Sequence, residues 1–417
     1  MALIVQKYGG TSVADCERIE HVAGKIAATR AQGHDVVVAV SAMAGETDRL
    51  LGLAHRLVPR PNQRELDVLL ASGEQVSIAL LSIALEKRGV MARSFTAAQV
   101  CIRTDSVHTK ARIQEIDTGA LRAQLAAGCV PVVAGFQGLD AQGDITTLGR
   151  GGGDTTAVGL AAALKADECQ IYTDVEGVYT ADPRVVPQAR RLPRITFEEM
   201  LELASQGSKV LQIRAVEFAG KYNVPLRVLS TFKEGAGTLI TYEDQSVEAA
   251  VVSGIAFNRD EAEVALVGVP HEAGIAHRIL GPVADAHVEV DMIVQNVARD
   301  GRLDFSFTIH RNDYPQVMDI LQANLRAIGA ERLQGNDRVV KLSIVGVGMR
   351  SHAGVASTLF RALAEKGIEI RLVATSEIKV SVVVDEKHLE SGVRALHEAF
   401  GLERAPREET LHRGAAG

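Results

Sequence analysis

The first 230 residues alternate short, strongly apolar runs with longer helical patterns. Continuous β-branched runs are typical of strands buried on both faces, and their alternation with helices indicates a parallel sheet covered on both sides. The expected fold class is therefore α/β, with an open, mostly parallel sheet sandwiched by helices. The expected strands are residues 3–5, 36–40, 130–134, 169–173 and 224–229, and the clearest expected helices are 13–31 and 66–88.

An internal repeat, with its two copies 80 residues apart, occupies much of the remaining chain. The motif HEAGIA around Gly274 returns as HAGVA around Gly354, and VEVDM at 288–292 returns as IEIRL at 368–372. Each copy reads as strand, turn, helix, two strands and helix. A unit of this length that occurs twice predicts two small α+β, ferredoxin-like domains rather than a solenoid.

The sequence pattern of the first 230 residues changes after residue 230, and this change sets the expected domain boundaries. A strand within 250–263 could be shared with the second small domain. We expect an α/β domain at 1–230, a linker at 231–250, small domains at 251–337 and 338–402, and a flexible polar tail at 403–417.

Composition excludes several classes of function. A net charge of −7, 4% aromatic residues and no Trp argue against nucleic acid as a partner. The four cysteines are scattered, which disfavours a disulfide framework or a zinc site and predicts small buried side chains in a reducing compartment. No run approaches the length of a membrane span and no basic leader is visible, so we expect a cytoplasmic protein without a membrane partner.

The segment TLGRGGGDTT at 147–156 precedes an Ala- and Leu-rich helical stretch. Glycines let a backbone approach a ligand closely, and a helix N-terminus offers unpaired N–H groups and partial positive charge. Arg150 could grip a carboxylate or phosphate with two hydrogen bonds. The segment predicts an anion-binding loop. It is not the dinucleotide fingerprint, because Asp154 stands where a glycine is needed.

Two further segments follow expected strands and each has two readings. KYGGTS at 7–12 is either a phosphate cradle containing Lys7 or a tight turn capped by Thr or Ser. SAMAGET at 41–47 is either a ligand loop at a strand end or another capped turn.

Glu74 stands directly before the uncharged run 75–85. A carboxylate beside such a segment suggests burial, which is expensive without a partner. The alternative is a first-turn acid that complements the helix dipole, and from the residues alone that alternative is favoured.

The segment 173–184 is punctuated by Gly and Pro. Tyr179 could stack on a base and Arg184 could reach phosphates, while the alternative is a surface hairpin. Lys209, in the Gly-Ser-Lys run that precedes another helical stretch, is a second candidate phosphate ligand. The chain has no P-loop, H-E-x-x-H or G-x-S-x-G motif.

Taken in order, these segments resemble the aspartokinases of the amino acid kinase family, and the repeat resembles their paired ACT domains. The resemblance covers essentially the whole chain. It implies transfer of the γ-phosphoryl group of ATP to the β-carboxylate of L-aspartate, giving 4-phospho-L-aspartate, the first step of lysine, threonine and methionine biosynthesis. The matching segments are 7–12, 40–43, 71–74, 147–152 with Asp154, 173–174, 178–184 and 207–209.

The resemblance also implies residue roles. Lys7 and Lys209 would flank the transferred phosphoryl group and Asp154 would orient them, with Mg²⁺ arriving on ATP rather than in a protein metal site. The aspartate carboxylate is already ionised at pH 7, so positioning and charge neutralisation should suffice. The aspartate site would comprise Ser41, Thr47, Glu74 on the α-ammonium, Arg150 on the α-carboxylate, and Gly151. The nucleotide site would comprise Lys7, Tyr8, Gly9, Gly10, Thr173, Asp174, Tyr179, Asp182, Arg184 and Lys209.

The paired ACT domains imply feedback inhibition by lysine, threonine or both, and a homodimer formed through these domains. The implied effector contacts are Gly274, Ile275, Ala276, Asp291, Gln295 and Asn296. This chain departs from the family pattern at Gly153, where Ser is common, at Ala273 and Ala353, where Pro is usual, and at His271, where an acid is frequent.

Three alternatives stay open. The chain could phosphorylate another amino-acid carboxylate, such as that of glutamate. It could be a catalytically inactive amino-acid sensor, against which the retention of Lys7, Asp154 and Lys209 argues. A nicotinamide dehydrogenase is disfavoured by the missing fingerprint.

Overall fold

The computed structural model describes residues 1–208, 210–242, 252–297, 301–347, 349, 352 and 354–404. The chain forms two compact units, and each is described by itself. The first comprises Met1–Val178, Arg191–Ala204 and Lys209–Ser246, and the second comprises Tyr179–Arg190, Ser205–Ser208 and Val247–Gly417.

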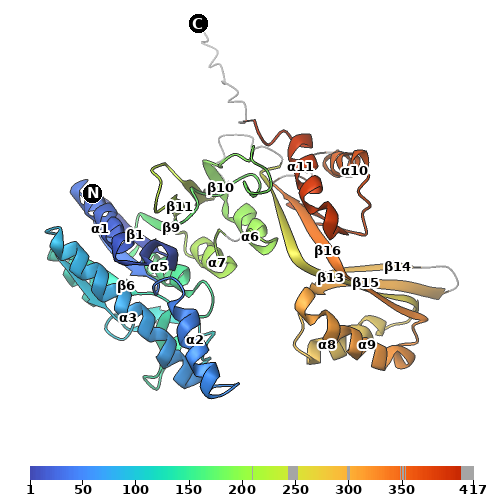
Figure 1. The fold of residues 1–417 in the computed structure, drawn as a ribbon, viewed down its shortest axis with the longest axis horizontal. Helices are drawn as coiled ribbons and strands as arrows, with labels where there is room; N and C mark the ends of the chain where they lie inside the picture. The colour runs from blue at the N-terminus through green and yellow to red at the C-terminus, as the bar shows by residue number, and fades with distance from the viewer. Residues whose placement is uncertain are drawn as a thin grey trace, which may run out of the picture. The chain divides into compact units, whose positions relative to one another are not determined.

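The first unit is built on an eight-stranded sheet, and the expected open, mostly parallel sheet is confirmed (Figure 1). Only β10 and β12, the two neighbouring strands at one end of the strand order, run against the others. β12 lies inside the stretch expected to be a linker. The strand order is β10 (Arg194–Thr196), β12 (Thr238–Thr241), β11 (Leu226–Ser230), β9 (Glu168–Thr173), β1 (Leu3–Tyr8), β2 (Asp35–Val40), β6 (Val130–Ala134) and β3 (Ala92–Phe95).

Helices cover both faces of this sheet. On one face, α1 (Cys16–Ala31) and α3 (Gln63–Lys87) bury apolar residues against β1, β2 and β6. On the other face, α5 (Gly152–Leu164) packs against β1, β2 and β9, and α7 (Ile213–Lys221) packs on α5. The remaining helices are α2 (Glu46–Leu57), α4 (Gly119–Ala126) and α6 (Phe197–Ser205). A small second sheet has the order β5 (Ile113–Ile116), β4 (Ile102–Thr104), β7 (Gln137–Leu139) and β8 (Ile145–Thr147).

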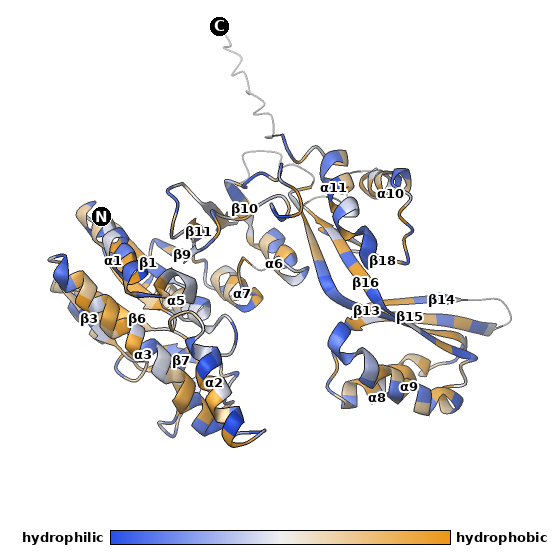
Figure 2. Ribbon diagram, in the orientation of Figure 1, coloured by the Kyte–Doolittle hydropathy of each residue, from blue (hydrophilic) through white to orange (hydrophobic). Residues whose placement is uncertain are grey.

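Two expectations drawn from composition are wrong. Helix α3 is long and apolar enough to cross a membrane by length and composition, with 56% of its most apolar window buried (Figure 2). Its apolar side chains cover the sheet, which is what a core helix of a folded domain requires. Among the cysteines, Cys16 and Cys101 are exposed, whereas Cys169 is buried as expected.

The second unit holds a six-stranded antiparallel sheet, and the two-copy element order is confirmed. Gly274 and Gly354 both begin a helix in the left-handed conformation, with φ of 86° and 104°. The strand order is β14 (Val290–Val297), β15 (Arg302–His310), β13 (Gly254–Pro270), β16 (Arg332–Val345), β18 (Lys379–Asp385) and β17 (Leu372–Thr375). The helices are α8 (Ile275–Asp285), α9 (Tyr314–Ile328), α10 (Val355–Glu365) and α11 (Leu389–Ala399).

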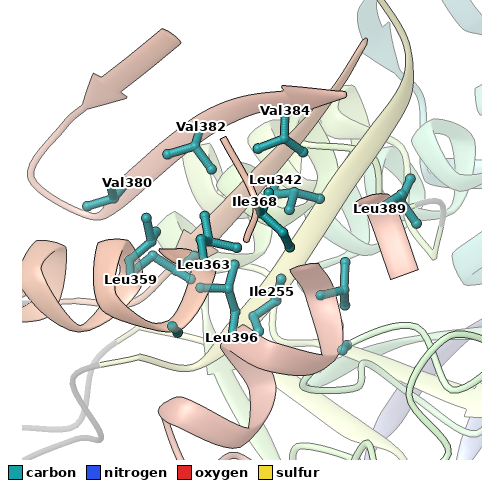
Figure 3. Close-up of a cluster of buried hydrophobic side chains, with 14 of the residues drawn as sticks. Ile255, Leu342, Leu359, Leu363, Ile368, Val380, Val382, Val384, Leu389 and Leu396 are labelled. Atoms are coloured by element: carbon teal, nitrogen blue, oxygen red, sulfur yellow. The ribbon is translucent and has the colours of Figure 1, made fainter. Parts of the chain in front are cut away.

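The second copy has a core of its own, in which α10 and α11 pack on β13, β16 and β18 (Figure 3). Three residues from a distant segment, Ala181, Val185 and Val186, are buried in this core. Arg394 Nε of α11 also donates to the Val185 carbonyl, at 2.9 Å. Within 173–184, Val178, Thr180 and Ala181 are buried, so the alternative of a surface hairpin is wrong.

Candidate active site

Lys7 and Asp154 form an ion pair at the carboxyl end of β1. Lys7 Nζ lies 2.6 Å from Asp154 Oδ1, and the two side chains are 13% and 10% exposed. Asp154 belongs to the first turn of α5, where the helix dipole favours an acid. Since open α/β sheets bind ligands at the carboxyl ends of their strands, this pair lies where chemistry is expected.

Two glycines border the pair, and a side chain at either position would press against neighbouring side chains. A Cβ at Gly9 would lie 3.3 Å from Lys7 Nζ. A Cβ at Gly153 would lie 2.9 Å from Ser41 Oγ and 3.3 Å from Lys7 Cε. Gly153, where Ser is common in the family pattern, therefore lies against the Ser41 hydroxyl. That hydroxyl borders the space that a side chain at this position would need.

The two capped-turn alternatives are wrong. The 3₁₀ turn Gly10–Val13 and helix α2 begin after Gly9 and Gly45, and neither has a side-chain cap. Thr47 lies half-buried in the first turn of α2. Both turns therefore form without a hydrogen bond from a capping side chain.

Glu74 lies deep inside α3 and is 2% exposed, so the alternative of a first-turn acid is wrong. Oε1 accepts the backbone N–H of Ala42 at 3.0 Å. Oε2 is buried and has no hydrogen-bond partner within the described residues. Burial raises the pKa of this carboxyl to about 7, although the Ala42 N–H lowers it in part. A cationic group would satisfy the unpaired oxygen.

The sequence did not predict a role for Ala42. This residue contributes only its backbone N–H, so its identity as alanine gives no indication of the role. Ala42 nevertheless links the predicted residues, because it binds Glu74 and follows Ser41, which borders Gly153. Lys7, Ser41, Glu74 and Asp154 are in this way brought together around the ends of β1 and β2.

Arg150 is exposed between two glycines in the left-handed conformation. The φ angles of Gly149 and Gly151 are 77° and 70°, and Gly151 is the N-cap of α5. A side chain at Gly151 would collide with Gln212. Throughout the described ranges, no side chain or carbonyl pairs with the Arg150 guanidinium, so it is available for an anion.

The predicted nucleotide residues fall into both units. Thr173 and Asp174 follow β9 in the first unit, where Thr173 Oγ1 donates to Asp174 at 3.1 Å. Tyr8 is fully buried and stacks on Tyr172 at 4.7 Å, and its place in the nucleotide site stays a prediction. Gly10 begins the turn after β1.

Tyr179, Asp182 and Arg184 belong to the second unit. The Arg184 guanidinium reaches Asp182 at 2.7 Å, and its hydrogen bond lowers the pKa of that carboxyl. Lys209 lies outside the described residues. The described residues contain no group of three or more His, Cys, Asp or Glu that could hold a metal ion.

The predicted effector residues divide into two groups. Gly274, Ile275 and Ala276 begin α8, after β13 ends. β14 runs parallel to β13 with β15 between them, so Gln295 and Asn296, near the end of β14, lie at the same end of the sheet as the end of β13. Asp291, by contrast, lies at the start of β14 and pairs with Lys341. The structure does not bring Asp291 to the other five residues. Ala353, one of the departures from the family pattern, lies outside the described residues.

The geometry combines three unlike groups: a lysine–aspartate pair, a half-satisfied buried carboxylate, and a guanidinium without a partner. The carboxylate and guanidinium complement the two charges of a zwitterionic amino acid. The lysine ammonium can stabilise negative charge that develops nearby in a transition state.

Family models match most of the chain. The model of the amino acid kinase family matches residues 2–230. Two models of ACT domains match residues 264–326 and 342–400.

Full-length relatives and solved structures agree with these matches. An aspartokinase of Pseudomonas aeruginosa is 65% identical over 410 residues, covering 98% of this chain and 100% of the relative. E. coli aspartokinase III in complex with aspartate and ADP, in the R-state, is 26% identical with a TM-score of 0.78, covering 95% of this chain and 99% of that chain. The T-state of that enzyme, in complex with lysine and aspartate, gives the same values.

Proposed function

The chain belongs to the amino acid kinase family, as an aspartate kinase with two ACT domains, and we propose that the groups around Lys7 and Glu74 carry its reaction. The enzyme transfers the γ-phosphoryl group of ATP to the β-carboxylate of L-aspartate. The observation that carries the residue assignment is the buried, half-satisfied carboxylate of Glu74 close to the Lys7–Asp154 pair.

Glu74 and Arg150 bind the two groups that every α-amino acid shares. The unpaired Oε2 of Glu74 accepts the α-ammonium, which removes the penalty of a buried, unsatisfied oxygen. Arg150 donates to the α-carboxylate, supported by the backbone at Gly151. Ser41 and Thr47 border the pocket between these charges. The β-carboxylate is thereby directed towards Lys7.

Catalysis requires little proton transfer, because a carboxylate nucleophile is ionised at pH 7. Lys7 neutralises charge that develops on the transferred phosphoryl group, and Asp154 fixes the ammonium in place. Mg²⁺ bound to the ATP phosphates supplies further neutralisation. Lys209 remains a predicted second lysine, and Thr173, Asp174, Gly9, Gly10, Tyr179, Asp182 and Arg184 remain predicted nucleotide contacts.

An ATP-dependent hydroxamate assay with aspartate and glutamate tests this proposal. Lys7→Met should abolish turnover while the protein stays folded. Lys25→Met is a matched control, because Lys25 is 14% exposed and pairs with Glu234 at 2.8 Å in the same unit. Full activity of Lys7→Met, or equal use of glutamate, would contradict the assignment.

For regulation, we propose inhibition by lysine, threonine or both, bound near Gly274, Ile275, Ala276, Gln295 and Asn296. The lysine complex of E. coli aspartokinase III supports this choice. We also propose a homodimer formed through the ACT domains and a cytoplasmic location. Initial rates with each amino acid, alone and combined, test the effector, and light scattering tests the dimer. Unchanged rates would remove the regulatory proposal without affecting the catalytic one.

A further inference from the structure

A second carboxylate is buried in α3, one heptad before Glu74. Asp67 is fully buried, and both of its oxygens are satisfied. Oδ1 accepts the Thr147 hydroxyl at 2.6 Å, and Oδ2 lies 2.8 Å from His108 Nδ1. The backbone N–H of Thr109 reaches both oxygens, at 3.1 and 3.0 Å. Removing a carboxylate from water to this extent requires such a set of donors.

The Thr147 contact fixes the chain just before the anion-binding loop. Thr147 is the last residue of β8, three positions before Arg150, and is 1% exposed. The next carbonyl, of Leu148, accepts Arg214 Nη1 at 2.8 Å. Arg214 Nη2 also donates to the carbonyl of Ala111, at 2.7 Å. Two consecutive residues are therefore anchored immediately upstream of the loop.

The Thr109 contact supports the same loop from another direction. Thr109 has a φ of 66°, which is costly for a β-branched residue and persists only where the surroundings impose it. Its N–H is held by Asp67, and its carbonyl oxygen would lie 3.0 Å from a Cβ at Gly149. Asp67 thus holds Thr109, a strained residue that lies against the loop at Gly149, one position before Arg150.

We propose that Asp67 is a positioning residue for aspartate binding. It fixes Thr147 and Thr109, these two residues define the path of the chain through Gly149, and that path aims Arg150 at the substrate α-carboxylate. The inference rests on the proposed role of Arg150. Asp67 itself does not touch the substrate.

The chain offers a matched control on the same two elements. Arg64 of α3 pairs with Asp144, in the turn between β7 and β8, at 2.6 Å. This pair also connects α3 to β8, but it is partly exposed and lies away from the loop, and exposed pairs contribute little.

Steady-state kinetics on the full chain test the proposal, with aspartate and ATP varied separately. Thr147→Val removes only the hydroxyl donor and should raise the KM for aspartate roughly tenfold, in line with the cost of small misplacements of a binding group. The KM for ATP should stay within about twofold, as expected for a site that shares no partner with Thr147. Asp67→Asn should act in the same direction and more strongly. Thr147→Ser keeps the hydroxyl and should restore the wild-type KM, and Asp144→Asn should change neither KM.

Two results would overturn the inference. One is an unchanged KM for aspartate in Thr147→Val, and the other is an equal rise in both KM values, which a merely structural role would produce. Arg150→Lys separates the inference from the proposed function. If Arg150→Lys raises the KM for aspartate and Thr147→Val does not, only the inference fails. If Arg150→Lys leaves that KM unchanged, the proposed role of Arg150 fails and the inference fails with it. If Asp67→Asn does not fold, Thr147→Val still decides.

Discussion

Helix α3 buries two carboxylates, and they differ in whether both of their oxygens have a hydrogen-bond donor. Asp67 and Glu74 lie seven residues apart on the same face, and they are 0% and 2% exposed. Asp67 has donors on both oxygens, whereas Glu74 has one N–H on Oε1 and nothing on Oε2 within the described residues. Burial alone therefore does not identify a ligand-binding acid. The unsatisfied oxygen does, because a folded protein rarely leaves one without a ligand or water.

The largest expected effect is loss of aspartate binding in Glu74→Gln. A hydrogen bond to a charged group contributes about 1.5–3 kcal/mol, so the KM for aspartate should rise about 10- to 100-fold. The KM for ATP should stay unchanged, since the role proposed for Glu74 is in binding the amino acid. Steady-state kinetics with each substrate varied check this. A wild-type KM for aspartate would remove the distinction between the two carboxylates.

The two acids should affect stability in opposite directions. Asp67→Asn replaces an acceptor with a donor among four donor contacts, and should lower the free energy of unfolding by about 1–3 kcal/mol. Glu74→Gln removes a half-satisfied buried charge and should leave that free energy equal or higher at pH 8. Denaturant unfolding of both variants measures this. A fall of equal size in both variants would show that their environments are equivalent.

The pH dependence of aspartate binding should report Glu74. Its pKa lies near 7 in the folded protein, so the ionised fraction rises about tenfold between pH 6 and pH 8 and the KM for aspartate should fall by about that factor. Stability should change in the opposite sense. The folded protein keeps this proton up to about pH 7, whereas the unfolded chain releases it near the ordinary value of 4.5, so stability falls as pH rises through this window. Both trends should vanish in Glu74→Gln, and a flat KM in the wild type would contradict the assignment.

The smallest expected effect is that of Gly153→Ser. The new Cβ would lie 2.9 Å from Ser41 Oγ, the mobile end of a short side chain. A rotamer change there costs about 1 kcal/mol, which corresponds to about a fivefold rise in the KM for aspartate. Kinetics at fixed ATP check the value. A hundredfold loss would instead mean that the turn at Ala42, which supports Glu74, cannot adjust.

Local patterns in the sequence predicted the α/β fold, the two-copy repeat and the Lys7, Arg150 and Asp154 segments, because strand ends and glycine loops leave signals in neighbouring residues. The role of Asp67 left no such signal. Its partners lie 41, 42 and 80 residues away and meet only after folding. The same holds for Ala181, which lies in the Gly- and Pro-punctuated segment 173–184 but is buried in the core of the second unit. A suspicion of burial at Glu74 was available from the run 75–85, whereas its unpaired oxygen was not.

The most direct test of the central claim compares aspartate with succinate, which keeps both carboxylates and lacks the ammonium. The quantity to measure is the ratio of kcat/KM for the two acids, in the wild type and in Glu74→Gln. If Glu74 binds the ammonium, the wild type should favour aspartate by about 10- to 100-fold and Glu74→Gln should lose most of that preference. An equal preference in both proteins would show that Glu74 does not recognise the ammonium, and the account would be wrong.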